Sequence, residues 1–360
     1  MVNRLQVGHQ WQSTVSVDNL NKSNNNDNRT QQFMVMFPSL PTINYRQSPK
    51  LYLTEFLCLM ASILSLCLLL LVVCILPVQP VLQSNSTPTH THTTTATNGT
   101  NWIVLVAGSA GIANYGDQAN VYRAYHAARA HGVPDKNIIV MYTDDIAYNK
   151  QNPTPGIVIN EPNGPDVYNG VPKDYIGDDV NPITFLALLR GDRTLERNHK
   201  KVVKSGPNDN IFIYFIDHGS PDEVRFPHAK LFGAELNAAL RDLYDRKLFN
   251  KLVFYLESCE SGSMFEKYLP NNINIYATTA ANPKEPSMFM YCDDKIRPFC
   301  LGSYYSNSWL DNWEHMDIYT ETLQQQYDYI RSHTNKSHVM QYGDLSIAKL
   351  PVSYFLAGPK

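Results

Sequence analysis

The stretch IFIYFIDHGS, residues 211–220, decides how this chain folds. It begins with an uninterrupted apolar run, the pattern of a strand that is buried on both faces, and it ends in Asp217, His218 and Gly219. A second stretch, LVFYLESCESGS over residues 252–263, repeats this pattern with Cys259 at the point where the first has His218. Both stretches therefore predict a buried strand that delivers a reactive side chain at its end.

The sequence around these two stretches, from residue 101 onward, alternates short apolar runs with segments whose apolar residues recur at helical spacing. This alternation is typical of a mostly parallel sheet with helices on both faces. We therefore predict an α/β fold. The expected strands are Trp102–Ala107, Ile138–Tyr142, Ile211–Ile216, Leu252–Leu256 and Ile273–Ala277, and the expected helices are Ala119–Ala130, Pro182–Leu189 and Ala234–Tyr244.

His218 and Cys259 are the candidate reactive pair, because ligand crevices in such folds form at the carboxyl ends of the strands. A thiol becomes a nucleophile when an imidazole and a helix N-terminus stabilise its thiolate, and a helix is expected after Cys259. Gly219 permits close backbone approach, so its N–H and that of Cys259 are candidates for an oxyanion hole. A structural histidine and an inert buried cysteine remain the alternatives at this point.

Longer strings in the same region carry a resemblance to a known family. They include NYGDQA (114–119), KSGPNDNIFIYFIDHGS (204–220), FYLESCESGSMF (254–265) and INIYATTAANP (273–283). From residue 101 to about residue 357 the chain resembles the legumain family of asparaginyl endopeptidases, which share a caspase-like fold. The resemblance implies a cysteine endopeptidase in which Cys259 attacks the scissile carbonyl, His218 transfers the proton and Asn114 orients the imidazole.

The resemblance also implies roles around this pair. Asp217 matches an aspartate that the family ties to a succinimide and to peptide ligation, so transpeptidation is an expected side activity. Glu257 matches an acidic residue of the pocket that receives the substrate side chain, and Ser287 is expected near it. No cofactor and no metal are implied.

The chain departs from the family pattern at two places in that pocket. Gly116 and Asp117 stand where the family has Arg and His, and Ser303 stands where it has Asp. The missing charged groups hold the two ends of an asparagine amide, and a site built on hydrogen bonds to one side chain loses discrimination without them. We expect cleavage to persist, a weaker or changed preference for Asn at P1, and a neutral or basic P1 favoured by Asp117 and Glu257.

The cysteines indicate an oxidising compartment. Three of the six lie within residues 56–78, and Cys292 and Cys300 lie close together in a loop, where a disulfide is expected. Cys259 is then left as a free thiol.

Residues 56–78 form an uncharged, Leu-rich run long enough to cross a membrane as a helix. Basic residues precede this run, and the next one after it is Arg123, so the peptidase region is expected in the lumen. A membrane anchor and a cleaved signal segment remain open alternatives. Residues 1–55 are expected to be a disordered extension, residues 79–100 a Thr- and Ser-rich linker, and residues 101–360 the peptidase domain. Glycosylation sequons stand at Asn85, Asn98 and Asn335.

Bulk composition narrows the partners. With 43% hydrophobic residues, 18% charged residues and a formal net charge of −3, the chain has no basic field for nucleic acid. Protein and peptide substrates are expected, together with the membrane if residues 56–78 are retained. The expected location is the secretory pathway, in a lysosome or vacuole or outside the cell.

Two other functions remain possible. A glycosylphosphatidylinositol transamidase would use the same Cys–His pair, but it predicts a C-terminal membrane helix, and the sequence after Ser337 contains none. An inactive membrane glycoprotein is conceivable because the pocket is altered, although Asn114, His218 and Cys259 are all retained. The chain ends soon after Gly343, where the family continues into an autoinhibitory prodomain, so control of activity is expected to differ if the sequence is whole.

Overall fold

The structure is a computed structural model that describes residues 99–359. The predicted extension, the apolar run 56–78, nearly all of the linker and the sequons at Asn85 and Asn98 lie outside the described residues. Within residues 99–359, no helix is both long enough and apolar enough to cross a membrane.

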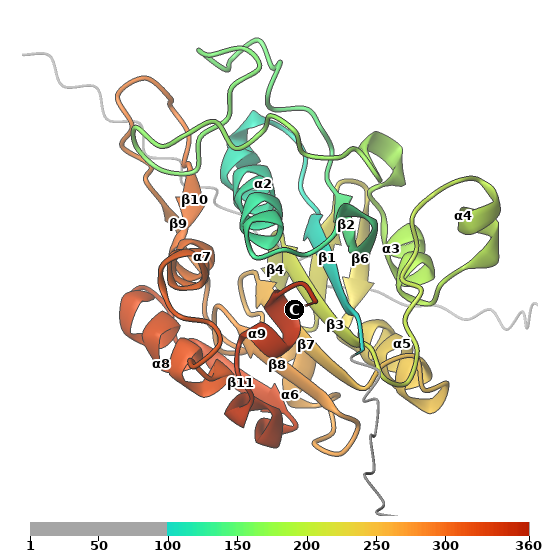
Figure 1. Cartoon of the computed structure of the whole chain (residues 1–360). Coiled ribbons are helices and arrows are strands. Elements are labelled where there is room, and N and C mark those ends of the chain that lie inside the picture. Colours follow the sequence, from blue (N-terminus) through green and yellow to red (C-terminus); the bar gives the residue numbers. More distant parts are fainter. Residues whose placement is uncertain (1–98, 360) are drawn as a thin grey trace, which may run out of the picture. The chain divides into compact units, whose positions relative to one another are not determined.

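The centre of the described region is a six-stranded sheet with the strand order β11-β8-β7-β3-β1-β2 (Figure 1). Five strands run parallel, and only β11 at the edge is antiparallel to its neighbour β8. The prediction of a mostly parallel α/β sheet is confirmed. The strands are β1 (Asn101–Ala107), β2 (Ile138–Met141), β3 (Asn210–Ile216), β7 (Lys251–Glu257), β8 (Ile275–Thr279) and β11 (Met340–Gly343).

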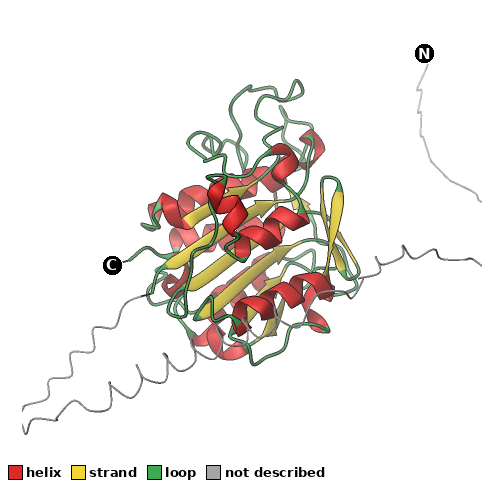
Figure 2. Cartoon of the chain, turned by 90° about the vertical axis from the view of Figure 1, so that its right-hand side faces the viewer, coloured by secondary structure: helices red, strands yellow, loops and turns green. Residues whose placement is uncertain are grey.

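Helices cover both faces of this sheet (Figure 2). Side chains alternate along β1, so Ile103 and Leu105 enter one buried core while Val104 and Val106 enter the other. Burying apolar surface on both faces explains why the strands read as continuous apolar runs. The first core lies under α2 (Tyr115–Ala130), α7 (Tyr304–His315), α8 (Leu323–His333) and α9 (Ser353–Leu356), and the second under α3 (Pro182–Leu189), α5 (Gly233–Asp245) and α6 (Ser263–Glu266).

Two small antiparallel sheets flank the site end of the main sheet. One follows His218 directly and consists of β4 (Gly219–Ser220), β5 (Glu223–Phe226) and β6 (Ala229–Phe232). The other is the hairpin of β9 (Phe289–Met290) and β10 (Gly302–Ser303). Sequence analysis predicted neither, because strands of two to four residues are too short to show an alternating pattern.

Candidate active site

Strands β3 and β7 are parallel neighbours, and Ile216 at the end of β3 lies opposite Glu257 at the end of β7. His218 and Cys259 each follow two residues later, so they leave the sheet at the same edge. The N–H of Asp217 donates to the carbonyl of Glu257 at 3.1 Å, which extends the strand pairing by one residue beyond β3. Both reactive side chains line one pocket, as a shared site requires.

Asn114 holds the imidazole of His218. Its Oδ1 lies 2.9 Å from His218 Nε2, and its Nδ2 donates to the carbonyl of Ala110 at 2.7 Å, which fixes the orientation of the amide. An amide oxygen can only accept, so Nε2 carries the hydrogen and Nδ1 of the neutral ring keeps a free lone pair. Desolvation and then Arg225 lower the pKa of His218, which favours this neutral form.

Cys259 is half-buried beside the loop that leads to β9. Its Sγ lies 3.8 Å from the carbonyl oxygen of Ser287. Burial raises the pKa of the Cys259 thiol, and Glu260 adds to this effect. The resting pair is therefore a thiol and a neutral imidazole, and the thiolate forms when Nδ1 takes the proton.

The predicted helix after Cys259 is shorter and later than expected. It is α6, which has only four residues and starts at Ser263, and Glu260 lies between with a left-handed φ of 48°. A single turn at this distance contributes little dipole stabilisation to a thiolate. The imidazole is therefore the main partner of the thiol.

Gly219 can only be glycine. A Cβ built on it would lie 2.3 Å from the carbonyl oxygen of Cys259 and 2.7 Å from Ser258 Oγ. The backbone of Gly219 therefore lies close to that of Cys259, and the oxyanion hole formed by their N–H groups stays a prediction.

The pocket beside Cys259 is small, with a cavity volume of about 30 Å³. Its lining combines the reactive pair with carboxyl, hydroxyl and apolar side chains. Most of the residues that sequence analysis assigned to the site are among them. The lining residues are Asp117, Ile216, Asp217, His218, Glu257, Cys259, Ser287, Met288, Phe289 and Ser303.

Glu257 is buried in the lining of the pocket and accepts hydrogen bonds from serine residues there. Its Oε2 accepts from Ser303 Oγ at 2.8 Å and from Ser306 Oγ at 3.3 Å. Ser303 is also the N-cap of α7. Burial raises the pKa of Glu257 despite these hydrogen bonds.

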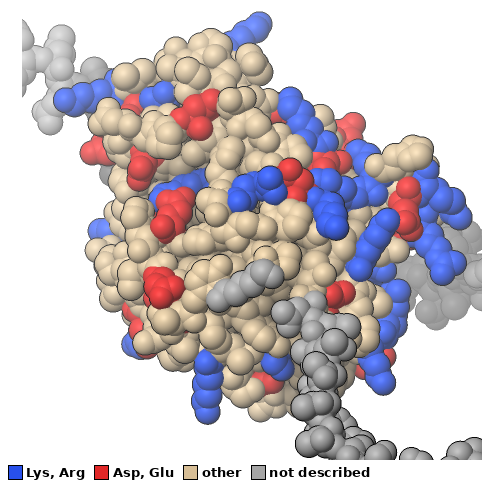
Figure 3. Space-filling model, viewed as in Figure 1, with Lys and Arg blue, Asp and Glu red and all other residues tan. Residues whose placement is uncertain are grey.

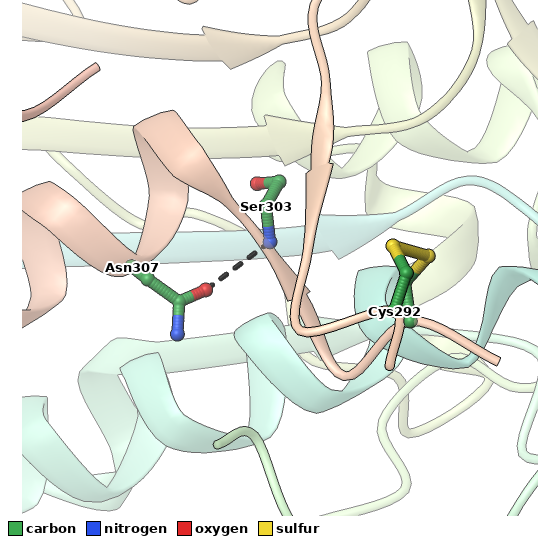
Figure 4. The surroundings of a disulfide bond; sticks show 4 residues. Cys292, Ser303 and Asn307 are labelled. Atoms are coloured by element: carbon green, nitrogen blue, oxygen red, sulfur yellow. Dashed lines mark hydrogen bonds between the residues drawn. A yellow bond between two sulfur atoms is a disulfide. The ribbon is translucent and has the colours of Figure 1, made fainter. Parts of the chain in front are cut away.

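The backbone of Ser303 is fixed from the same helix. Asn307, in the first turn of α7, accepts a hydrogen bond from the N–H of Ser303 at 3.1 Å (Figure 4). Nearby, Cys292 and Cys300 form a disulfide between β9 and β10. Cys259 is the free cysteine within residues 99–359. The hairpin that contributes Phe289 and Ser303 to the pocket is therefore cross-linked.

Asp117 and Asp217 complete the acidic lining. Ser109 Oγ donates to Asp117 Oδ2 at 2.6 Å. Burial raises the pKa of Asp117 to about 7, against the effect of Ser109 and with a contribution from Glu257. Asp217 accepts the N–H of His218 on Oδ1, while its Oδ2 is buried without a hydrogen-bond partner. Burial and then Asp117 raise the pKa of Asp217 well above its usual range.

Gly116 does not line the pocket but lies behind its wall. A Cβ at Gly116 would lie 2.9 Å from the nitrogen of Gly302 and 3.2 Å from the carbonyl oxygen of Cys300. The space of a longer side chain is thus filled by the backbone that leads into β10. Asn335, the sequon within the described region, is exposed on a turn.

Sequence analysis missed Ser109, Ser306 and Asn307. Single hydroxyl and amide residues that hydrogen-bond to site residues form no motif, so no sequence signal marks them.

The geometry as a whole, a thiol and an oriented neutral imidazole at adjacent strand ends, defines the class of cysteine-dependent acyl-transfer sites. The family model described as "Peptidase C13 family" matches residues 101–358 of this chain. This chain belongs to the peptidase C13 family.

The most similar relatives carry three names. Legumain of Homo sapiens is 52% identical over 259 residues, which cover 71% of this chain and 59% of that protein. The vacuolar-processing enzyme of Vicia sativa is 46% identical over 270 residues, with 72% and 55% covered. The hemoglobinase of Schistosoma mansoni is 46% identical over 261 residues, with 72% and 60% covered. The chain thus spans less than two thirds of the length of these curated relatives.

Among solved structures, caspase-1 of Spodoptera frugiperda aligns with a TM-score of 0.40 and 8% identity, covering 68% of this chain and 87% of that one. A similarity this weak carries no argument, so the description of the fold rests on the strand order given above.

Proposed function

We propose that this chain is a cysteine endopeptidase in which residues 101–360 form the catalytic domain. The observation that carries the proposal is the meeting of Cys259, His218 and Asn114 at one edge of the sheet, with Nε2 of the imidazole occupied by Asn114 Oδ1. This arrangement leaves Nδ1 free as the base. The peptidase C13 match and the names of the relatives support the same reaction class.

The reaction follows from these groups. Nδ1 of His218 takes the proton of the Cys259 thiol, and the thiolate adds to the scissile carbonyl. The N–H groups of Gly219 and Cys259 stabilise the oxyanion. The C–N bond then breaks as His218 returns the proton to the leaving amine, which leaves a thioester on Cys259. Water, deprotonated by His218, hydrolyses the thioester and restores the thiol.

Asp217 adds a second outcome for the thioester. An incoming peptide amine in place of water would give transpeptidation, the side activity that the resemblance implies for this position. Asp217 lines the same pocket as Cys259, which is compatible with that role.

The proposed location is the secretory pathway, ending in a lysosome or vacuole or outside the cell. The disulfide of Cys292 and Cys300 supports an oxidising compartment, and one group of relatives is named for vacuolar processing. Glycosylation at the exposed Asn335 and retention of residues 56–78 as a membrane anchor belong to the same proposal.

The test is cleavage of a peptide library by the full-length chain, with Cys259→Ala as the control. We expect the alanine variant to lose at least about 10⁴-fold in kcat, because it lacks the nucleophile. A thiol-directed probe should label the wild type more than Cys259→Ala, a comparison that corrects for labelling of Cys58, Cys67 and Cys74. Equal cleavage by the two proteins would refute the proposal.

A further inference from the structure

We propose that the pocket beside Cys259 receives a positively charged P1 side chain, so that the enzyme cleaves after lysine or arginine. This inference rests on the proposed peptidase function and specifies its substrate class. It is carried by the carboxyl groups that line the pocket and by the ionic partners that those groups lack.

The pocket gathers three carboxyl groups from three different elements. Asp117 comes from α2, Asp217 from the end of β3 and Glu257 from the end of β7. No lysine or arginine is among the lining residues, and the imidazole of His218, with its lowered pKa, stays neutral. The nearest cation to act on Asp217 is Arg225, but its side chain is half exposed and lies towards Glu223 and Ser220.

Two of these carboxyl groups, Asp117 and Glu257, have hydroxyl partners and no ionic ones. Ser109 donates to Asp117, while Ser303 and Ser306 donate to Glu257. A hydroxyl supplies a hydrogen bond without supplying the charge that would offset the desolvation of a carboxylate. A lysine or arginine side chain supplies both.

Asp217 adds a third carboxyl group without an ionic partner. Its side chain lines the pocket with an overall exposure of 6%, and its Oδ2, which is buried beside Gly108, has no hydrogen-bond partner. An unpaired buried acceptor is costly, and a positive charge in the adjacent pocket would lower the cost of ionising this carboxyl group.

One buried acid elsewhere has an ionic partner. Glu223, which is 8% exposed, pairs with Lys230 at 2.9 Å. The carboxyl groups of the pocket lack such a partner.

The remaining walls fit the aliphatic part of a basic side chain. Ile216, Met288 and Phe289 line the pocket beside the acids, and the methylene stems of lysine and arginine pack on such apolar surface while the charged end reaches polar groups. A metal ion is a poor alternative occupant, because no three His, Cys, Asp or Glu side chains within residues 99–359 are arranged to hold one.

The experiment compares otherwise identical fluorogenic peptides with Lys, Arg, Asn, Gln, Asp or Leu at P1, cleaved by the full-length chain above pH 7. We expect kcat/KM for Lys and Arg to exceed that for Asn by roughly 10- to 100-fold, the range for pairing a buried charge. Glu257→Gln and Asp117→Asn keep the size of each side chain and its role as hydrogen-bond acceptor. Each should lower the ratio of Lys to Asn cleavage by about 10-fold.

The matched control is Asp222→Asn. Asp222 is outside the pocket, pairs with Lys267 at 3.1 Å and has a φ of 64° that asparagine tolerates. This variant should keep the wild-type ratio of Lys to Asn cleavage. Thermal melting of all variants separates a lost preference from a lost fold, and Asp117→Asn still tests the inference if Glu257→Gln does not fold.

A binding measurement separates this inference from the proposed function. Fluorescence anisotropy with Cys259→Ala should show tighter binding of the P1-Lys peptide than of the P1-Asn peptide. If the wild type cleaves no peptide, the peptidase proposal fails while this measurement still decides the pocket's preference. If the wild type cleaves after Asn or Leu better than after Lys and Arg, or if the variants leave the ratio unchanged, the inference is overturned and the peptidase stands.

Discussion

The carboxyl groups at the two ends of the central sheet have different kinds of partner. At the carboxyl ends of the strands, the pocket acids are buried among hydroxyl groups. At the amino ends, where β1 starts and Asp209 precedes β3, a second groove is lined by lysines. There Lys200 pairs with Asp179 at 2.7 Å, Lys201 with Asp174 at 3.0 Å and Lys204 with Glu196 at 2.6 Å.

Lysine and arginine side chains gather on the side of the molecule where α4 (Arg193–Arg197) lies, and acidic side chains are interspersed among them (Figure 3). Lys204 lowers the pKa of Glu196, whereas burial raises the pKa of Asp117 to about 7. The lysine end completes its own ion pairs, while the pocket end leaves its acids for a substrate.

The largest difference in activity between the two ends of the sheet is expected when a glycine at each end is replaced by alanine. Gly219→Ala would place a Cβ 2.3 Å from the carbonyl oxygen of Cys259, so the oxyanion donors must move. We expect kcat to fall by roughly 10²- to 10³-fold. Gly206→Ala, before β3, meets its nearest atom, Asp209 Oδ2, at 3.8 Å and should leave kcat unchanged. Steady-state kinetics on both variants checks this, and equal activities would contradict it.

A smaller effect is expected from removing one amide at each end. Asn114→Ala removes the hydrogen bond that fixes the tautomer of His218. We therefore expect kcat to fall by about 10- to 100-fold at nearly constant melting temperature. Asn210 donates to Asn101 and to the carbonyl of Tyr354 at the start of β3. Asn210→Ala should instead lose about 1–3 kcal/mol of stability and keep its kcat.

Asn114→Ala should therefore lower kcat without lowering the melting temperature, and Asn210→Ala should do the reverse. Loss of stability without loss of activity in Asn114→Ala would remove Asn114 from the site.

The smallest effect concerns pH. The pKa of Asp117 is raised in the folded state, so the folded protein binds the proton more tightly than the unfolded chain does. Stability is therefore fully present at acid pH and is lost as pH rises from the usual aspartate range through about 7. We expect the melting temperature of the wild type to fall between about pH 5 and pH 8.

Two variants test whether Asp117 causes this slope of melting temperature against pH. Asp117→Asn should flatten it, because it removes one proton-binding site of the folded state. Glu196→Gln should leave it unchanged, because the pKa of Glu196 is lowered and its titration lies below this window. A wild-type melting temperature that rises towards pH 8 would show that the carboxyl groups of the pocket lose their protons without a cost in folding stability.

The sequence predicted the site end of the sheet well because β3 and β7 are buried on both faces, which produces an unmistakable apolar run before His218 and before Cys259. It placed β8 two residues too early, since Ile273 is buried just ahead of the strand itself. It missed β11, whose half-buried Gln341 and Gly343 show no strand pattern. It also missed α7, in which buried Asn307 and Asn312 interrupt the apolar face.

The partners of the site residues were less predictable. Asn114 was assigned only through the family resemblance, because a single asparagine before a helix carries no signal of its own. The hydroxyl group of Ser306 reaches Glu257 from 49 residues away in sequence, and that of Ser109 reaches Asp117 from the loop before α2. Tertiary folding alone brings these groups together.

The contact between Gly116 and Gly302 limits how this pocket can change. A side chain at Gly116 would meet the backbone nitrogen of Gly302 at 2.9 Å, and a Cβ at Gly302 would meet Asn307 Oδ1 at 2.2 Å. Backbone atoms cannot move aside as the end of a flexible side chain can, so a long residue at Gly116 requires the backbone that leads into β10 to shift. A side chain at Gly302 requires the side chain of Asn307 to move. Any evolutionary or engineered route to a different selectivity at this wall must alter the helix and the cross-linked hairpin together.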